Sequence, residues 1–169
     1  MSAPENVLTN LNLFVDGRGY AGQVDNVDPP KMTLLLEEFR GGGMNAPINL
    51  TMGHEALVMG WEMINYSPDI LALWSVAEGF DLAFNIRGNL ANVDGTNTGI
   101  KWECRGKISE LDPQNVKPGA APRLKGTAQL VYYKLTHGTR VVTEIDVINM
   151  VQIIDGVDVL QQVRDNLGM

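Results

Sequence analysis

Apolar and polar residues alternate along several short stretches of this chain. The clearest stretch is 98–108, where Ile100, Trp102, Cys104 and Ile108 share one parity and charged residues fill the other. Successive side chains of a strand point to opposite faces, so the pattern predicts a half-buried antiparallel strand. Gly106 lies on the apolar parity and leaves a gap there, which predicts a bulge or a close neighbouring strand.

The same reasoning, together with turn residues, predicts strands along most of the chain. They cover residues 12–15, 20–24, 31–39, 55–63, 80–87, 124–135, 141–148 and 150–154. Glycine-containing turns are expected at 16–19, 94–95, 136–139 and 155–156. With about eight strands in all, the chain has to close into a barrel, stack as a sandwich or cover itself by assembly.

Two short helices complete the prediction. The first starts at Ser67-Pro68-Asp69, with Ser as N-cap and Pro in the first turn. Its apolar stripe is Ile70, Leu73, Trp74 and Ala77, and Gly79 ends it. The second follows Asp158 as a cap, carries Leu160, Val163 and Leu167 on one face and closes at Gly168.

The predicted strand 31–39 differs from the others because it is apolar on both faces. Such a strand needs cover on both sides, which in a small domain another subunit can supply. Residues 40–47 then form a loop with three glycines. A phosphate cradle is excluded, since no Lys-Ser/Thr pair and no strand-loop-helix context follow. The residues alone leave open a flexible excursion or an interaction loop.

Composition and charge narrow the class of protein. The 169 residues form one domain (1–169), with an extended loop at about 40–50. The net charge is 13 − 20 = −7, which argues against a surface that grips nucleic acid by its phosphates. Cys104 is the only cysteine, so we expect folding in a reducing compartment. The first ten residues hold Glu5 and no basic cluster, and we expect no ordinary signal peptide.

No catalytic or metal-binding constellation emerges from the sequence. His54 and His137 lack the spacing of metal ligands, and no serine lies in a nucleophile elbow. Cys104 sits among apolar neighbours, which favours an inert thiol. The acidic residues of the strands are more typical of solvated faces than of acid–base pairs. We therefore expect no enzymatic activity, no cofactor and no metal.

Five motifs carry a family resemblance. They are Asn12-Leu13-Phe14-Val15-Asp16-Gly17, Phe39-Arg40-Gly41-Gly42-Gly43-Met44-Asn45-Ala46-Pro47, Glu144-Ile145-Asp146-Val147-Ile148-Asn149, Asp155-Gly156-Val157-Asp158 and Arg164-Asp165-Asn166-Leu167-Gly168-Met169. Together they make the chain similar to the major tail tube proteins of contractile-tailed bacteriophages and R-type pyocins. The match runs from near residue 10 to the end. In the middle of the chain, it concerns the pattern of predicted elements more than the identity of the residues.

The resemblance implies a mainly β fold, an antiparallel barrel or sandwich with one flanking helix and a short C-terminal helix. It implies hexameric rings that stack into a hollow tube inside a contractile sheath, in the virion tail or a tail-like particle, made in the host cytoplasm. The implied partners are the sheath, baseplate and tail terminator proteins. In a phage, DNA passes through the lumen unbound and the tube pierces the cell envelope.

The resemblance also assigns residues. The glycine loop becomes an arm that reaches an adjacent subunit or ring, through Arg40, Gly41, Gly42, Gly43, Met44 and Asn45. An acidic lumen lets DNA slide, and the candidate lumen acids are Glu37, Glu62, Glu144 and Asp146. The Lys and Arg residues of the stretch 98–108 either face outward or balance them.

Three alternatives remain open at this point. They are a type VI secretion-like tube protein, a monomeric β-barrel that binds a ligand, and an enzyme on a β scaffold. The sequence does not separate a phage tail from a pyocin.

Overall fold

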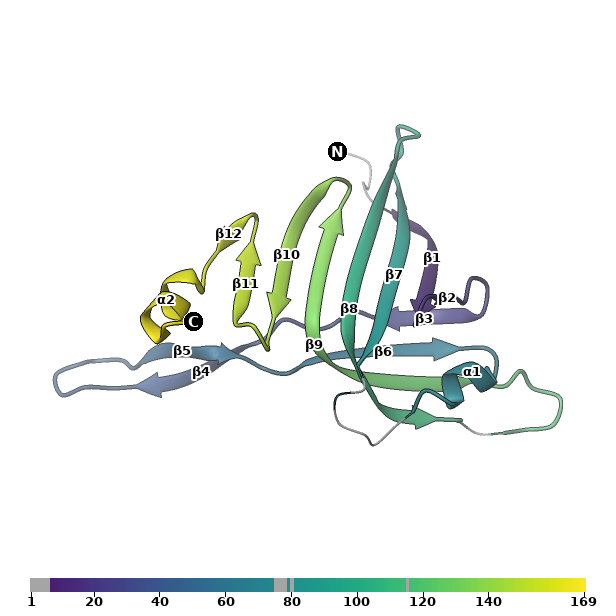
Figure 1. The fold of residues 1–169 in the computed structure, drawn as a ribbon, viewed down its shortest axis with the longest axis horizontal. Helices are drawn as coiled ribbons and strands as arrows, with labels where there is room; N and C mark the ends of the chain where they lie inside the picture. Colours follow the sequence, from purple (N-terminus) through teal and green to yellow (C-terminus); the bar gives the residue numbers. More distant parts are fainter. Residues whose placement is uncertain (1–6, 75–78, 80, 115) are drawn as a thin grey trace.

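The computed structural model describes residues 7–74, 79, 81–114 and 116–169, and within them the fold is almost entirely antiparallel β-structure (Figure 1). The strands are β1 (Val7–Val15), β2 (Arg18–Gly19), β3 (Val24–Asp28), β4 (Leu34–Phe39), β5 (Ile48–His54), β6 (Leu57–Met63), β7 (Leu82–Ala91), β8 (Asn97–Asp112), β9 (Leu124–His137), β10 (Arg140–Asp146), β11 (Val151–Ile154) and β12 (Val157–Asp158). The helices are α1 (Pro68–Leu71) and α2 (Gln161–Leu167).

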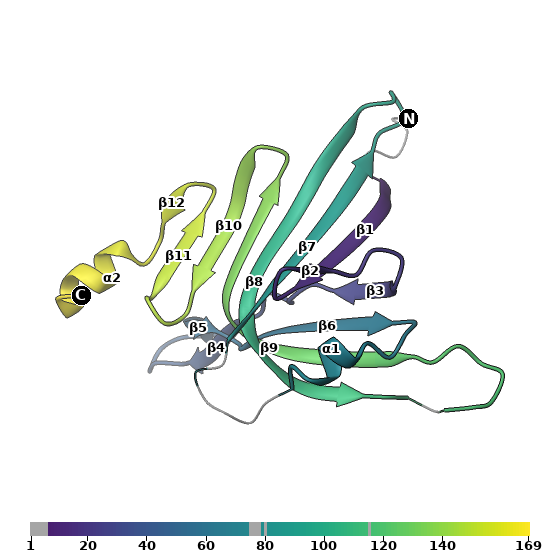
Figure 2. The same ribbon diagram turned by 45° about the vertical axis from the view of Figure 1, so that its right-hand side comes forward.

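One large sheet folds over itself to make two layers. Its strand order is β12-β11-β10-β9-β8-β7-β1-β2, while β6 pairs with both β9 and β3. The long strands β8 and β9 bend sharply, so that their far halves join β6 and β3 in a second layer that crosses behind the first (Figures 1 and 2). This confirms the mainly β fold with barrel-like or sandwich-like layers.

Gly106 marks the bend. The pairing of β8 with β9 shifts register between Arg105 and Gly106 and again between Ile108 and Glu110. A Cβ built at Gly106 would fall 2.0 Å from the backbone oxygen of Gln129, so the two strands approach too closely there for any side chain. Both interpretations of this glycine, a bulge and a close neighbour, are confirmed.

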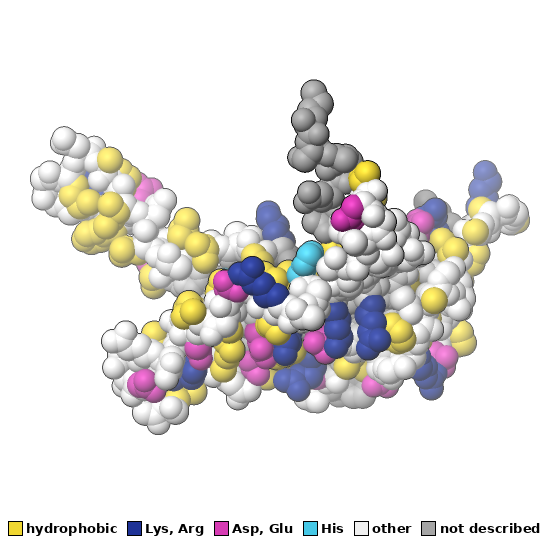
Figure 3. Space-filling model, turned by 90° about the horizontal axis from the view of Figure 1, so that it is seen from above, with side chains coloured by type: hydrophobic (Ala, Val, Ile, Leu, Met, Phe, Trp, Pro, Cys, Tyr) yellow, Lys and Arg dark blue, Asp and Glu magenta, His cyan; other side chains and the backbone are white. Residues whose placement is uncertain are grey.

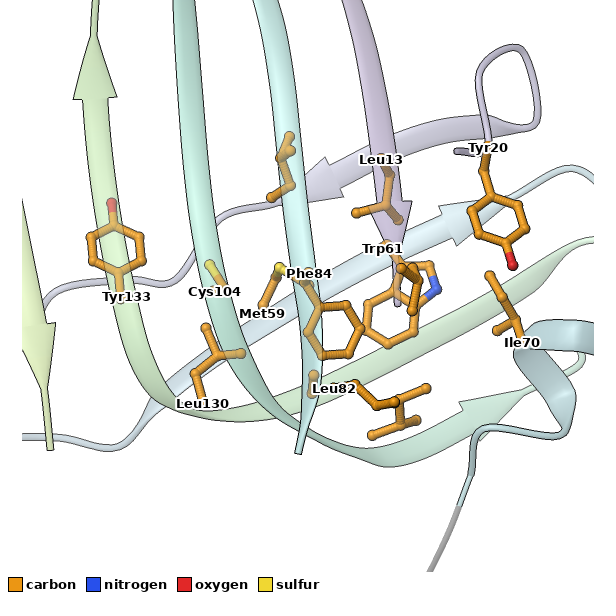
Figure 4. Close-up of a cluster of buried hydrophobic side chains, with 14 of the residues drawn as sticks. Leu13, Tyr20, Met59, Trp61, Ile70, Leu82, Phe84, Cys104, Leu130 and Tyr133 are labelled. Atoms are coloured by element: carbon orange, nitrogen blue, oxygen red, sulfur yellow. The ribbon is translucent and has the colours of Figure 1, made fainter. Parts of the chain in front are cut away.

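The hydrophobic core fills the space between the two layers (Figure 4). Alternation in β6 buries Leu57, Met59, Trp61 and Met63, as the sequence predicts. The Trp61 and Phe84 rings lie 5.5 Å apart at an interplanar angle of 39°. On β8 the apolar parity also points inward, and burial raises the pKa of the Cys104 thiol to about 12. The thiol is therefore inert at neutral pH, as expected.

The first hairpin is shorter than predicted. Asp16 and Gly17 both have positive φ (49° and 79°), which makes a two-residue turn, so β1 pairs directly with Arg18–Gly19. The expected strand 20–24 is wrong, because the chain turns at Tyr20–Gln23 and continues as β3, which pairs with β6. The segment after the turn therefore pairs with the distant strand β6 and not with the neighbouring strand β1.

The other boundaries shift by a few residues. The predicted strand 31–39 begins at Leu34, and the predicted strand 141–148 ends at Asp146, whose carboxylate accepts a hydrogen bond from the backbone N–H of Asn149 at 3.0 Å. The twelve described strands exceed the expected number of about eight. The prediction missed β5, which begins inside the loop expected at about 40–50, and short strands such as β2 and β12 that extend hairpins.

Helix α1 begins as predicted, with Ser67 as its N-cap, Pro68 in the first turn and Asp69 after it, whereas α2 begins differently. α1 follows Ser67, but the Ser67 hydroxyl makes no capping hydrogen bond, and the helix ends at Leu71. Ile70 is buried, whereas Trp74 lies beyond the helix and is 49% exposed; Ala77 and Phe80 lie outside the described residues. The N-cap of α2 is Leu160 instead of Asp158, and Gly168 closes it at φ 71°, as predicted.

Candidate assembly surfaces

The strands β4 and β5 form a hairpin, here called the arm, that extends away from the body of the molecule (Figure 1). Among the described strands, these two pair only with each other. Seven large apolar side chains of the arm are 44–57% exposed: Leu34, Leu35, Leu36, Phe39, Ile48, Leu50 and Met52. A two-stranded hairpin is marginally stable alone in water. Since no other described strand pairs with the arm, its exposed apolar side chains call for cover from another molecule.

The two faces of the arm differ in polarity. The pairs Phe39–Ile48 and Glu37–Leu50 share one face, on which Leu35 and Met52 also lie by strand parity, so only Glu37 is charged there. The other face carries Leu34, Leu36, Glu38, Asn49 and Thr51. One face is thus almost continuously apolar and the other is mixed, as predicted for a strand with apolar residues on both sides.

The glycine-containing loop 40–47 forms the tip of the arm. Inside it, the Arg40 Nε donates to the Met44 backbone oxygen at 3.3 Å, and the Met44 N–H donates to the Gly41 oxygen at 3.3 Å. Gly43 has φ 89°, a conformation that other residues rarely adopt. The loop is therefore a folded hairpin tip, and Arg40, Asn45, Ala46 and Pro47 are exposed on it.

A second surface is the outward face of the first layer, on the side opposite the core. We call this surface the polar face. The register of the strands arranges its side chains in rows that run across β7, β8, β9 and β10. One row holds Arg87, Lys101, Thr136 and Val141. The next holds Asn85, Glu103, Lys134 and Glu144, and the third holds Ala83, Arg105, Tyr132 and Asp146. Figure 3 shows basic and acidic side chains interleaved on this side, opposite the yellow side chains of the arm.

The acidic residues of the polar face form ion pairs or hydrogen bonds with neighbouring side chains. Lys101 Nζ lies 2.6 Å from Glu103 Oε1, and Lys134 Nζ lies 3.7 Å from Glu144 Oε2. The Tyr132 hydroxyl donates to Glu144 Oε1 at 2.8 Å. Burial raises the pKa of Asp146, but hydrogen bonds from Asn149 and Ile148, together with the charge of Arg105, outweigh this, and the net pKa is lowered.

The structure does not bring the four predicted lumen acids together. Only Glu144 and Asp146 lie on the polar face, whereas Glu37 lies on the arm. Glu62 belongs to β6 in the second layer, where Arg123 Nη1 contacts its Oε1 at 2.7 Å. The polar face holds Arg87, Lys101, Arg105 and Lys134 against Glu103, Glu144 and Asp146, or 4 − 3 = +1. Of its bases, Lys101 and Arg105 belong to the polar parity of the stretch 98–108, whereas Arg87 comes from β7 and Lys134 from β9.

The C-terminal helix presents a third surface. Asp158 anchors it, since Arg164 Nη2 lies 2.5 Å from Asp158 Oδ2 and Arg164 Nη1 donates to the Met150 oxygen at 2.8 Å. The hydrogen bond from Arg164 lowers the pKa of Asp158. Val163 and Leu167 share a helix face, as predicted, but both remain exposed. Like the arm, α2 offers apolar surface that the subunit alone does not cover.

Among the described residues, no group of three or more His, Cys, Asp or Glu side chains could hold a metal ion. Within the same residues, no helix is long and apolar enough to cross a membrane. The notable features are therefore surfaces: the arm, the polar face and α2.

Comparison with known proteins identifies relatives over nearly the whole chain. The family model described as "Phage tail tube protein FII" matches residues 5–168. The tail tube protein of Escherichia phage P2 is 32% identical over 163 residues, covering 94% of this chain and 95% of the relative. The major tail tube protein of Serratia phage KSP20 is 27% identical over 154 residues, covering 86% and 85%.

A solved structure supports the fold independently of sequence. The PVC sheath–tube complex of an extracellular contractile injection system, in its extended state, contains a chain that superposes with a TM-score of 0.58 at 11% identity. The match covers 75% of this chain and 88% of that one.

Proposed function

This chain belongs to the phage tail tube protein FII family, and from that premise we propose that it assembles into hexameric rings whose stacking forms the inner tube of a contractile tail. The protein is a structural subunit of the virion tail and not an enzyme. Membership also favours a phage tail tube over the three alternatives, which were a type VI-like tube, a ligand-binding barrel and an enzyme.

The arm is the observation that carries the assembly proposal. It exposes apolar side chains on a hairpin without a packing partner in the subunit. Contact with an adjacent subunit or ring removes this surface from water, at about 25 cal/mol per Å² of apolar area. The tip residues Arg40, Gly41, Gly42, Gly43, Met44 and Asn45 then belong to the interface.

The polar face is assigned to the lumen. It is the broad surface of the subunit that is rich in charge, and it lies opposite the apolar arm (Figure 3). β2 pairs with only Phe14 and Val15, so most of the outer edge of β1 is available for pairing between copies, as is the short β12 at the other end of the sheet. On this arrangement the sheath binds the outer layer, terminator and baseplate proteins bind the tube ends, and DNA passes along the polar face.

Negative-stain electron microscopy of the purified protein, with light scattering over a concentration series, tests the assembly. We expect hexameric rings or tubes at high protein concentration. An interface of this obligate kind buries on the order of 2,000 Å² or more. A monomer at every concentration, also in kosmotropic salt, would contradict the proposal.

A further inference from the structure

Two arginines of the polar face are each held above an aromatic ring. The Arg87 guanidinium carbon lies 5.2 Å from the ring centroid of Phe14, and that of Arg105 lies 5.5 Å from the centroid of Tyr132. Both distances are within the range of a cation–π interaction. Both arginine residues are exposed to solvent, so a ligand can approach the guanidinium groups while the rings contact them.

Each arginine also borders a shallow hollow in the surface. The hollow beside Arg105 has a volume of about 220 Å³ and is also lined by Asn85, Glu103 and Tyr132. The hollow beside Arg87 has a volume of about 480 Å³ and is lined by Asn10, Asn12 and Asn89 among others. Both side-chain N–H groups of Asn89 donate to Thr9 and Asn97, so the amides that accompany the guanidinium groups are Asn85 beside Arg105 and Asn10 and Asn12 beside Arg87.

Local charge favours an anion at these two positions. The whole chain carries −7, yet the polar face carries +1. Its two lysines lie beside acidic residues, Lys101 next to Glu103 and Lys134 next to Glu144. Arg87 and Arg105 each contact an aromatic ring. Asp146, the third acid of the face, accepts hydrogen bonds from Asn149 and also interacts with the charge of Arg105, so an anion at Arg105 competes with this carboxylate.

We propose that Arg87 and Arg105 form a phosphate-contacting track on the tube wall, which touches the backbone of DNA weakly and without reading its sequence. This inference rests on the proposed function, because it needs the polar face to line the lumen. Guanidinium groups match phosphate geometry, and such contacts are independent of base sequence and sensitive to salt. The acidic residues beside the track limit its affinity, so that the polymer is guided without being held.

Binding of a fluorescein-labelled 20-base-pair DNA duplex to the purified subunit, followed by anisotropy from low to physiological salt, tests the track. We expect weak binding at low salt. The Arg87→Gln/Arg105→Gln variant removes two contacts, so we expect the slope of log K against log salt to fall by about 1.8, from about 0.9 per contact. Affinity at low salt should fall at least about fivefold.

The matched control is Arg18→Gln/Arg140→Gln, which changes net charge equally. Arg18 pairs with Asp69 and Arg140 with Asp155, both away from the polar face. We expect this variant to bind like the wild type. Equal losses in both variants, or no binding by the wild type at low salt, would overturn the track. The Arg87→Lys/Arg105→Lys variant keeps the charge and should retain the salt slope, even if the glutamine variant folds poorly.

A reconstruction of assembled tubes separates the two levels of the proposal. Tubes whose polar face lines the bore, but whose subunits do not bind the duplex, retain the proposed function and exclude the track. Tubes whose polar face lies outside the bore overturn both the lumen assignment and the track. Absence of tubes contradicts the assembly itself, whatever the subunit binds.

Discussion

Gly126 of β9 lies directly beneath the indole ring of Trp61 on β6, so that a Cβ built at Gly126 would fall 2.2 Å from the Trp61 Cζ2. The two residues are cross-strand partners, and Trp61 is fully buried against Phe84. We predict that Gly126→Ala displaces this ring and lowers the free energy of unfolding by about 1–3 kcal/mol, the usual cost of overpacking a core. Denaturant unfolding measures the change.

Gly99→Ala is the matched control for that substitution. Gly99 also lies in a long strand, but no atom lies within 4 Å of its built Cβ and its φ is not positive. We expect its stability to stay within about 0.5 kcal/mol of the wild type, as for most surface changes. Equal effects at both glycines would mean that backbone entropy, and not the contact with Trp61, governs stability here.

The arm should be dispensable for the fold of the subunit and necessary for assembly. Replacing residues 40–47 by an Asn–Gly turn shortens the tip but leaves β4 and β5 able to pair. We expect an unchanged far-ultraviolet circular dichroism spectrum and no tubes by electron microscopy. Normal tubes from the shortened protein would make the tip a passive loop.

A point variant probes the apolar face of the arm without altering its length. Leu50 lies on that face opposite Glu37 and is 44% exposed, so Leu50→Ser removes apolar surface without creating a core cavity. We expect the concentration required for assembly to rise at least about tenfold. Asn49→Ser, on the other face, is the control and should change that concentration much less.

Local patterns predicted the elements whose partners are local. Alternation identified the buried residues of β6, and Asp155-Gly156 identified a hairpin turn with φ of 50° and 81°. Prediction failed after Tyr20, because β3 pairs with β6, far along the chain. Nothing in residues 20–28 distinguishes that distant partner from the nearer β1. Propensity also overestimated α1, which ends at Leu71, since tertiary packing decides the length of so short a helix.

The same limit applies to the assembly surfaces. Exposed apolar residues in the arm were predictable, because strand 31–39 is apolar on both parities. In contrast, the sequence could not predict that Glu144, Lys134 and Glu103 share one face, because this depends on the register of three strands. The parity of a residue within its strand predicts on which face of the sheet its side chain lies. Only the register between strands shows which charged side chains are neighbours.

The buried Cys104 thiol provides a probe of the folded state. Its pKa is raised to about 12 because burial disfavours the thiolate. The reactive thiolate is therefore scarce at pH 8 in the native protein, and we predict labelling by a thiol reagent at least about a hundredfold slower than in denaturant. The stability due to the neutral thiol is present below the unfolded pKa, near 8.5, and declines as pH rises toward 12. Rapid native labelling at pH 8 would contradict this burial.

The anchor of α2 should respond to acid. Hydrogen bonding by Arg164 lowers the pKa of Asp158, so the ionised carboxylate favours the anchored state. This contribution is present above the ordinary aspartate pKa, about 4, and is lost as pH falls through the lowered value. We predict that hydrogen exchange in residues 161–167, corrected for intrinsic rates, is slow and constant above about pH 5 and accelerates below about pH 4. Asp158→Asn should exchange rapidly and show no such transition.

Charge on the polar face should control the passage of DNA. Glu144→Lys changes the charge by two per subunit beside Lys134, and a hexameric ring repeats that change around the bore. The added lysines attract the DNA phosphates. Screening acts over roughly 8 Å at physiological salt, which weakens this attraction without removing it inside a narrow pore. We predict that Glu144→Lys particles assemble but eject DNA more slowly, and that the defect diminishes as salt rises. Glu37→Lys makes the same change on the arm, so it should impair assembly and leave ejection from any completed particle at wild-type speed. Wild-type ejection by Glu144→Lys would remove the electrostatic role of this face, and slowing by Glu37→Lys would place the lumen on the arm instead.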